Sequence, residues 1–104
     1  LFKKCIEQKV DGIVVEGFGS GNVPSYLVPV IKTALDNNIL IIMTTRCFDG
    51  EAMGEYDYEG GGEQLEKMNV IFAGSLSSQK ARIKLMVLLA AGKSKEEIAA
   101  AFSK

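Results

Sequence analysis

Two runs of apolar residues constrain the fold of this chain more than any other feature of its sequence. The first lies near Gly12–Val15 and the second at Ile39–Met43, and neither alternates with polar residues. Unbroken runs of this kind are typical of strands covered on both faces, as in parallel sheets. Between them, the apolar positions of residues 24–38 recur at the spacing of one helix face. This alternation predicts an α/β fold of flavodoxin-like type, a small three-layer parallel sheet of about three strands with helices on both faces. The strands are expected near residues 12–16, 39–43 and 70–73.

The ends of the helices carry their own signals. Pro29 is expected in a first helical turn, where its missing N–H costs nothing, and Asn37-Asn38 is a plausible stop. Ser77 or Ser78 should cap a strong helix through Leu89, with Gly92 ending it. Ser94 and Glu97 have the spacing of a capping box. Helices are therefore expected over residues 2–9, 24–38, 63–68, 77–89 and 94–102.

Composition excludes several classes of function. The chain has 104 residues, enough for one domain, and a formal net charge of −1, which argues against nucleic-acid or anionic-membrane binding by bulk charge. Histidine is absent, so the chain alone cannot assemble Ser-His-Asp or Cys-His catalysis and lacks the commonest metal ligand. No cofactor is predicted. The opening Leu1-Phe-Lys-Lys reads like the middle of a helix, so a fragment of a longer protein is expected.

A glycine-rich segment follows the first predicted strand, in Val14–Pro24, "VVEGFGSGNVP". Its spacing, Gly17-x-Gly19-x-Gly21, matches neither the dinucleotide fingerprint nor the phosphate-binding Walker loop. One reading is a tight turn that needs positive φ angles. The other is a ligand site, because ligands of open parallel sheets gather beyond the carboxyl ends of the strands. In that case Asn22 would offer amide donors and an acceptor to a polar partner.

A second polar segment, Thr44-Thr45-Arg46-Cys47, follows the second strand and is expected at the same edge of the sheet. Neither threonine has an evident base in the sequence, which argues against a nucleophilic role. Arg46 would favour the thiolate of Cys47, but this residue is more simply read as a half-buried small hydrophobe. The carboxylates of residues 51–59 are most simply a solvated surface, although one of them could point into a neighbouring subunit's pocket.

Three segments together resemble the C-terminal domain of bacterial L-asparaginases: "DGIVVEGFGSGNVP", "ILIIMTTRC" and "VIFAGSLSSQKARIKLMVLLAAGKSKEEIAAAF". The D subunit of the archaeal glutamyl-tRNA(Gln) amidotransferase shares much of the pattern. The resemblance implies a two-domain amidohydrolase whose catalytic threonines, aspartate and lysine lie in a larger N-terminal domain. The family's Thr-Gly-Gly-Thr motif does not occur here, so no catalytic residue is expected in this chain. Residues 1–104 would then form an asparaginase C-terminal domain clipped by about one strand at its N-terminus.

The resemblance also implies roles for four residues. Asn22 is similar to an asparagine that approaches substrate across the subunit interface, and Tyr58, within Tyr56–Glu59, is the best match to a loop residue that does likewise. Cys47 corresponds to a neighbour of an allosteric asparagine site in the cytoplasmic type I enzymes. Those enzymes place an arginine where this chain has Glu16, whose carboxylate would repel the carboxylate of the effector.

The predicted function is therefore that of a substrate-completing and subunit-assembly domain, inactive alone, in an enzyme hydrolysing L-asparagine to L-aspartate and ammonia. Its expected partners are its own N-terminal catalytic domain, neighbouring subunits and L-asparagine or L-glutamine, with no direct nucleic-acid contact and no membrane. The segment "GNVP" is similar to the cytoplasmic type and "QKAR" to the periplasmic type. Of these two compartments, the cytoplasm is the one predicted. Two alternatives stay open: the amidotransferase D subunit, and a non-catalytic small-molecule-binding or dimerisation module.

Overall fold

The sheet is parallel and three-stranded, as the apolar runs predict. The computed structural model describes residues 1–17, 23–45 and 62–103. Its strands are β1 (Gly12–Gly17), β2 (Leu40–Thr45) and β3 (Ile71–Phe72), in the order β1-β2-β3 with β2 in the centre. β1 pairs with β2 from Gly12↔Leu40 to Gly17↔Thr45, and β2 pairs with β3 through Ile42↔Ile71.

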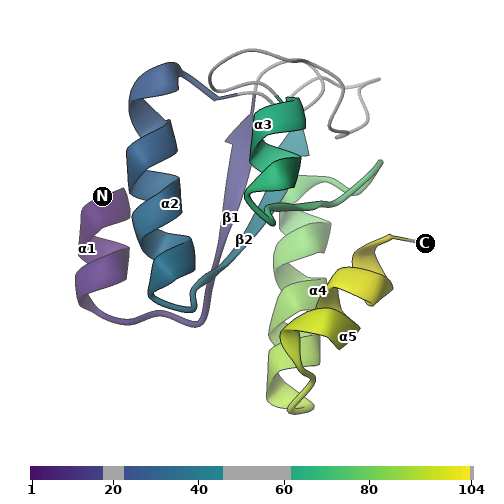
Figure 1. Cartoon of the computed structure of the whole chain (residues 1–104). Coiled ribbons are helices and arrows are strands. Elements are labelled where there is room, and N and C mark those ends of the chain that lie inside the picture. The colour runs from purple at the N-terminus through teal and green to yellow at the C-terminus, as the bar shows by residue number, and fades with distance from the viewer. Residues whose placement is uncertain (18–22, 46–61, 104) are drawn as a thin grey trace.

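Helices cover both faces of this sheet, which confirms the predicted layers. One face carries α1 (Phe2–Glu7), the short 3-10 helix η1 (Ser25–Leu27), α2 (Val28–Asp36) and α3 (Gly62–Lys67). The other face carries α4 (Ser78–Ala90) and α5 (Lys95–Phe102). In Figure 1, α1 and α2 lie on one side of β1 and β2, and α4 and α5 lie on the other.

Neighbouring residues of the central strand β2 point into two different cores. Ile41 and Met43 belong to the core beneath α2 and α3, and Leu40 and Ile42 belong to the core beneath α4 and α5. All four are buried. Because successive side chains of a strand point to opposite faces, a strand covered on both sides must be apolar at every position. This is the physical reason why the sequence of β2 does not alternate.

Four of the described helices end with one residue in the left-handed region, followed by a residue whose N–H reaches back five positions along the chain. This is the Schellman motif, which satisfies carbonyl groups that a helix end leaves unpaired. Asn38 and Gly92 lie at two of the predicted stops. Asn69 is of a residue type that favours this position, whereas Lys9 gives no such signal in the sequence. The bonds run from Val10 to Cys5, Ile39 to Ala34, Val70 to Leu65 and Lys93 to Leu88.

The structure corrects the limits of all three strands. β1 extends to Gly17, one residue beyond its predicted end, and β2 begins at Leu40 rather than Ile39, whose N–H is used at the end of α2. β2 extends to Thr45, although Thr44 and Thr45 were expected to begin a loop, because its ladder with β1 continues to the pair Gly17↔Thr45. β3 is limited to Ile71–Phe72 rather than residues 70–73, because the Val70 N–H is used at the end of α3.

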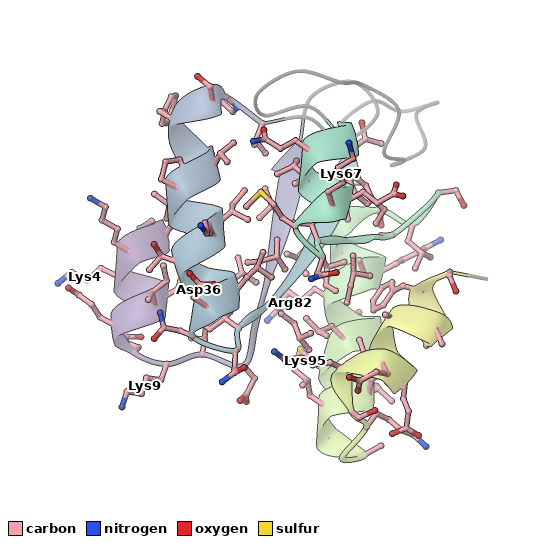
Figure 2. All side chains as sticks on the ribbon, viewed as in Figure 1. Lys4, Lys9, Asp36, Lys67, Arg82 and Lys95 are labelled. Atoms are coloured by element: carbon pink, nitrogen blue, oxygen red, sulfur yellow. The ribbon has the colours of Figure 1, made fainter. Side chains whose placement is uncertain are left out.

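The two helices on the second face begin with side-chain caps. Ser77, one of the two predicted candidates, caps α4 by accepting a hydrogen bond from the Lys80 N–H at 3.3 Å. α5 begins with the predicted capping box, in which Ser94 accepts from the Glu97 N–H and Glu97 accepts from the Ser94 N–H. Lys95 in the first turn of α5 also reaches Asn38 at the end of α2, with 3.1 Å between Nζ and Oδ1 (Figure 2).

The capping box predicts an acid-sensitive contribution to stability. The hydrogen bond from the Ser94 N–H, with smaller contributions from the Ser94 side chain and the charge of Lys93, lowers the pKa of Glu97 below its ordinary value of 4.5. A carboxyl whose pKa is lower in the folded state stabilises that state above the ordinary pKa, and the stabilisation is lost as the pH falls through the lowered value. The stability advantage of the native protein over Glu97→Gln should therefore shrink on acidification below pH 4.5.

Thermal unfolding of both forms between neutral pH and pH 3 would measure this difference. Glu96→Gln is the matched control, because Glu96 lies in the same first turn but outside the capping box. A difference between native protein and Glu97→Gln that does not change with pH would contradict the prediction.

Candidate functional site

The carboxyl ends of β1 and β2 lie side by side at one edge of the sheet (Figure 1). These strands end at Gly17 and Thr45, which are register partners, and Glu16 is paired with Thr44 one position earlier. The described chain resumes at Val23, which is buried in the core beneath α2. Parallel sheets place their ligands at this edge, so it is the candidate functional site.

Thr44 has a structural role in this site. Its side chain is fully buried, and its hydroxyl donates a hydrogen bond to the Val15 carbonyl oxygen at 3.1 Å. A buried hydroxyl needs such a partner, because an unsatisfied polar group in a core is costly. The hydroxyl therefore ties β2 to β1 and is shielded from any substrate, which agrees with the argument against a nucleophilic threonine.

Glu16 is exposed and lies at the N-terminus of α4. Its Oε1 accepts a hydrogen bond from the hydroxyl of Ser78, the first residue of that helix. The N-terminus of a helix attracts negative charge through its unpaired N–H groups and its dipole. The protein's own carboxylate thus lies where a bound anion would otherwise be favoured.

Of the four predicted site residues, the described part of the chain contains Glu16. Asn22, Cys47 and Tyr58 lie outside the described residues, so their predicted roles are not tested by the structure. Sequence reasoning missed the pairing of Glu16 with Ser78, which are 62 positions apart. It had named Ser77 and Ser78 as alternative caps, and the structure gives each a separate partner.

A hollow lies away from this candidate site. It is a groove of about 890 Å³ lined by residues of α2, β3 and α5, including Asp36, Phe72 and Lys95. Neither Glu16 nor Thr44 lines it. Within residues 1–17, 23–45 and 62–103, no group of three or more histidine, cysteine, aspartate or glutamate residues could hold a metal ion. The helices of this same described part are all too short or too polar to cross a bilayer.

Comparison with known proteins relates this chain to one family. Residues 1–102 match the family model described as the glutaminase/asparaginase C-terminal domain. An L-asparaginase of Bacillus licheniformis is 41% identical over 93 residues, which cover 89% of this chain and 29% of that protein. A probable L-asparaginase of Deinococcus radiodurans is 38% identical over 96 residues, 92% of this chain and 29% of that protein.

Two further comparisons bear on the alternatives. The D subunit of the glutamyl-tRNA(Gln) amidotransferase of Pyrococcus furiosus is 34% identical over 89 residues, covering 86% of this chain and 20% of that protein. The crystal structure of L-asparaginase I from Vibrio cholerae superimposes with a TM-score of 0.76 at 23% identity, over 100% of this chain and 31% of that one, and supports the fold alone. The chain therefore spans less than a third of each of these relatives.

Proposed function

Since the chain belongs to the glutaminase/asparaginase C-terminal domain family, we propose that it is the substrate-completing and subunit-assembly domain of a longer L-asparaginase. The parent protein would hydrolyse L-asparagine to L-aspartate and ammonia. The observation that carries this proposal is the family match over residues 1–102, joined by 41% identity to an L-asparaginase. Amidotransferase D subunits are the second candidate, and those compared are 29–34% identical to this chain.

The catalytic groups are proposed to come from an N-terminal domain of the parent. The chain has no histidine and no Thr-Gly-Gly-Thr motif. At the candidate site, the hydroxyl of Thr44 is buried and already hydrogen-bonded to a backbone carbonyl. A nucleophilic hydroxyl needs an adjacent base and access to the substrate, and Thr44 lacks that access.

Asn22 and Tyr58 are proposed to contact the amino-acid substrate of a neighbouring subunit. This proposal is supported by the chain direction at the carboxyl edge: β1 ends at Gly17, five positions before Asn22, where ligands of parallel sheets bind. An amide side chain suits a zwitterionic amino acid, because it supplies donors and an acceptor without adding net charge. A homo-oligomeric parent follows from this arrangement, and the cytoplasm is its proposed compartment.

We also propose that no carboxylate-bearing effector binds beside Glu16 and Cys47. The support is electrostatic, because the Glu16 carboxylate lies at the N-terminus of α4 and accepts a hydrogen bond from Ser78. A second carboxylate brought to this position would meet like charge instead of the helix end.

The proposed division of labour predicts that residues 1–104 alone release no ammonia from L-asparagine or L-glutamine, whereas the full-length parent does. The expected reason is that the chain lacks the family's Thr-Gly-Gly-Thr motif and has no histidine to act as a base. Ammonia release by both forms, each purified free of host asparaginase, would be measured side by side with both substrates.

The outcomes separate the candidates. Activity of the isolated residues 1–104 above the background of a mock purification would contradict the division of labour. A full-length parent that is inactive on both free amino acids, and gains activity only with a charged tRNA and a partner subunit, would favour the amidotransferase candidate.

A further inference from the structure

Thr44 is a buried polar residue in a strand whose other buried residues are apolar. Its side chain has no exposed surface, and in the part of the chain that the structure describes it is the only buried residue that is polar. Leu40 and Ile42 point into the core beneath α4 and α5, and Thr44, two positions after Ile42, points to the same face. Valine has nearly the same shape and would fill this position without the cost of burying a hydroxyl. Core packing alone therefore does not explain a threonine here.

The hydroxyl of Thr44 makes one specific contact near the end of the strand ladder. It donates a hydrogen bond to the carbonyl oxygen of Val15 in the neighbouring strand, with 3.1 Å between the two oxygens. The register places Thr44 opposite Glu16, and the pair Gly17↔Thr45 is the last one of this ladder. The ends of a structural element open most readily, because few neighbours hold them. The hydroxyl therefore closes the ladder one pair before its end.

The end of β1 is held from a second side as well. Glu16, the residue after Val15, accepts a hydrogen bond from the hydroxyl of Ser78 in α4. Val15 is thus tied to β2 and Glu16 to α4, immediately before the strand ends at Gly17. Two consecutive residues that are fixed by two different elements give the chain a defined direction where it leaves the sheet.

This direction matters because of the segments that follow the two strands. Residues 17–22 contain three glycines, which restrict the backbone least of all residues, and end with Asn22. A glycine-rich segment has few side chains to hold it, so the position of the residue it carries depends on the strand from which it starts. β2 likewise leads into the segment that contains Tyr58. Thr44 lies where both segments begin.

We propose that Thr44 is a positioning residue for substrate binding, whose buried hydroxyl fixes the ends of β1 and β2 and thereby the two segments that follow them. The residue does not touch the substrate, since its side chain is shielded. The inference rests on the proposed function, in which these two segments contact the amino-acid substrate of a neighbouring subunit. Loss of the hydroxyl should therefore weaken substrate binding more than it weakens the fold.

Two substitutions in the full-length parent separate the hydroxyl from the volume of the side chain. Thr44→Val keeps the volume and deletes the hydrogen bond, whereas Thr44→Ser keeps the hydroxyl and deletes a buried methyl group. Kinetics on L-asparagine and L-glutamine would be measured well below the unfolding temperature. Thr44→Val should raise KM about tenfold at a nearly native kcat, because displaced contacts bind the substrate less well. Thr44→Ser should keep a nearly native KM.

Ile42→Val is the matched control, because it removes a buried methyl group from the same face of β2 at a distance from the strand ends. It should lower the thermal unfolding midpoint and leave KM at the native value. If Thr44 served the fold alone, its substitutions would reduce the active fraction of the enzyme, and hence kcat, at an unchanged KM. That result, or a KM raised equally by Thr44→Ser and Thr44→Val, would overturn the proposal.

Hydrogen exchange of the same full-length proteins gives a readout that does not depend on the reaction. The backbone amides at the ends of β1 and β2 should lose protection in Thr44→Val but not in Thr44→Ser, because the bond that closes the ladder is missing. Native protection of both strand ends in Thr44→Val would overturn the inference. A native parent that hydrolyses neither amino acid would instead contradict the proposed function, and the exchange comparison would still decide whether Thr44 fixes the strand ends.

Discussion

Replacing Ile42 with alanine is expected to lower the free energy of unfolding by about 2–5 kcal/mol. Ile42 has no exposed surface, lies in the central strand, and belongs to the core beneath α4 and α5 with Leu85, Ile98 and Phe102. Removing three carbon atoms there forfeits their burial and leaves a cavity that the flanking helices fill only in part. A domain of this size has a total stability of about 5–15 kcal/mol, so this one change removes a large share of it.

Urea unfolding of the native protein, Ile42→Val and Ile42→Ala would measure this effect. The valine variant is the matched control, because it deletes one methyl group without changing the branching at Cβ, and should cost about 0.5–1.5 kcal/mol. The two losses should increase in order of the volume removed. An alanine variant within about 0.5 kcal/mol of the native protein, the range typical of surface positions, would show that Ile42 is not part of a packed core.

The layers of this fold were predictable because burial on both faces leaves a direct trace in the sequence. In Ile39–Met43, no polar residue interrupts the run, and the structure divides those side chains between two cores. The strand limits were less predictable, because they depend on partners distant in sequence. Thr44 and Thr45 look like loop residues until β1 is placed beside them, and Val70 looks like strand until its N–H is seen at the end of α3.

The helix ends show the same division between local and tertiary causes. Gly92 indicates a residue in the left-handed backbone region, since glycine has no Cβ that would clash in that conformation. Lys9 gives no such signal, yet its φ angle is 55°. The chain must turn from α1 into β1 within a few residues, and the Schellman bonds at this turn compensate for the unfavourable backbone region.

The sequence predicts which edge of the sheet carries the candidate site, but it does not predict which residues contact one another there. Two strands that end in polar segments predict a site at the carboxyl edge, and Glu16 and Thr44 do lie there in register. The Glu16–Ser78 hydrogen bond depends on how α4 docks on the sheet, which periodicity does not report.

The second large effect concerns Asn22 in the full-length parent, where Asn22→Ala is expected to reduce kcat/KM by about one to two orders of magnitude with folding nearly intact. The proposed role is a hydrogen bond from the side-chain amide to a zwitterionic substrate, and loss of one such bond costs roughly 0.5–3 kcal/mol, the upper end applying to a charged partner. Glycines at 17, 19 and 21 precede this residue, and their missing Cβ atoms let a substrate approach the backbone.

A competing role for Asn22 is purely conformational, because asparagine also tolerates the left-handed region and favours turns and helix caps. Asn22→Gly separates the two roles: glycine keeps the turn and much of the cap preference but deletes the amide. If the amide binds substrate, the glycine variant should lose as much kcat/KM as the alanine variant while its thermal unfolding midpoint stays at the native value. If instead the glycine variant turns over L-asparagine at a near-native kcat/KM, the amide contributes nothing to the substrate, and the residue serves only to shape the chain between β1 and α2.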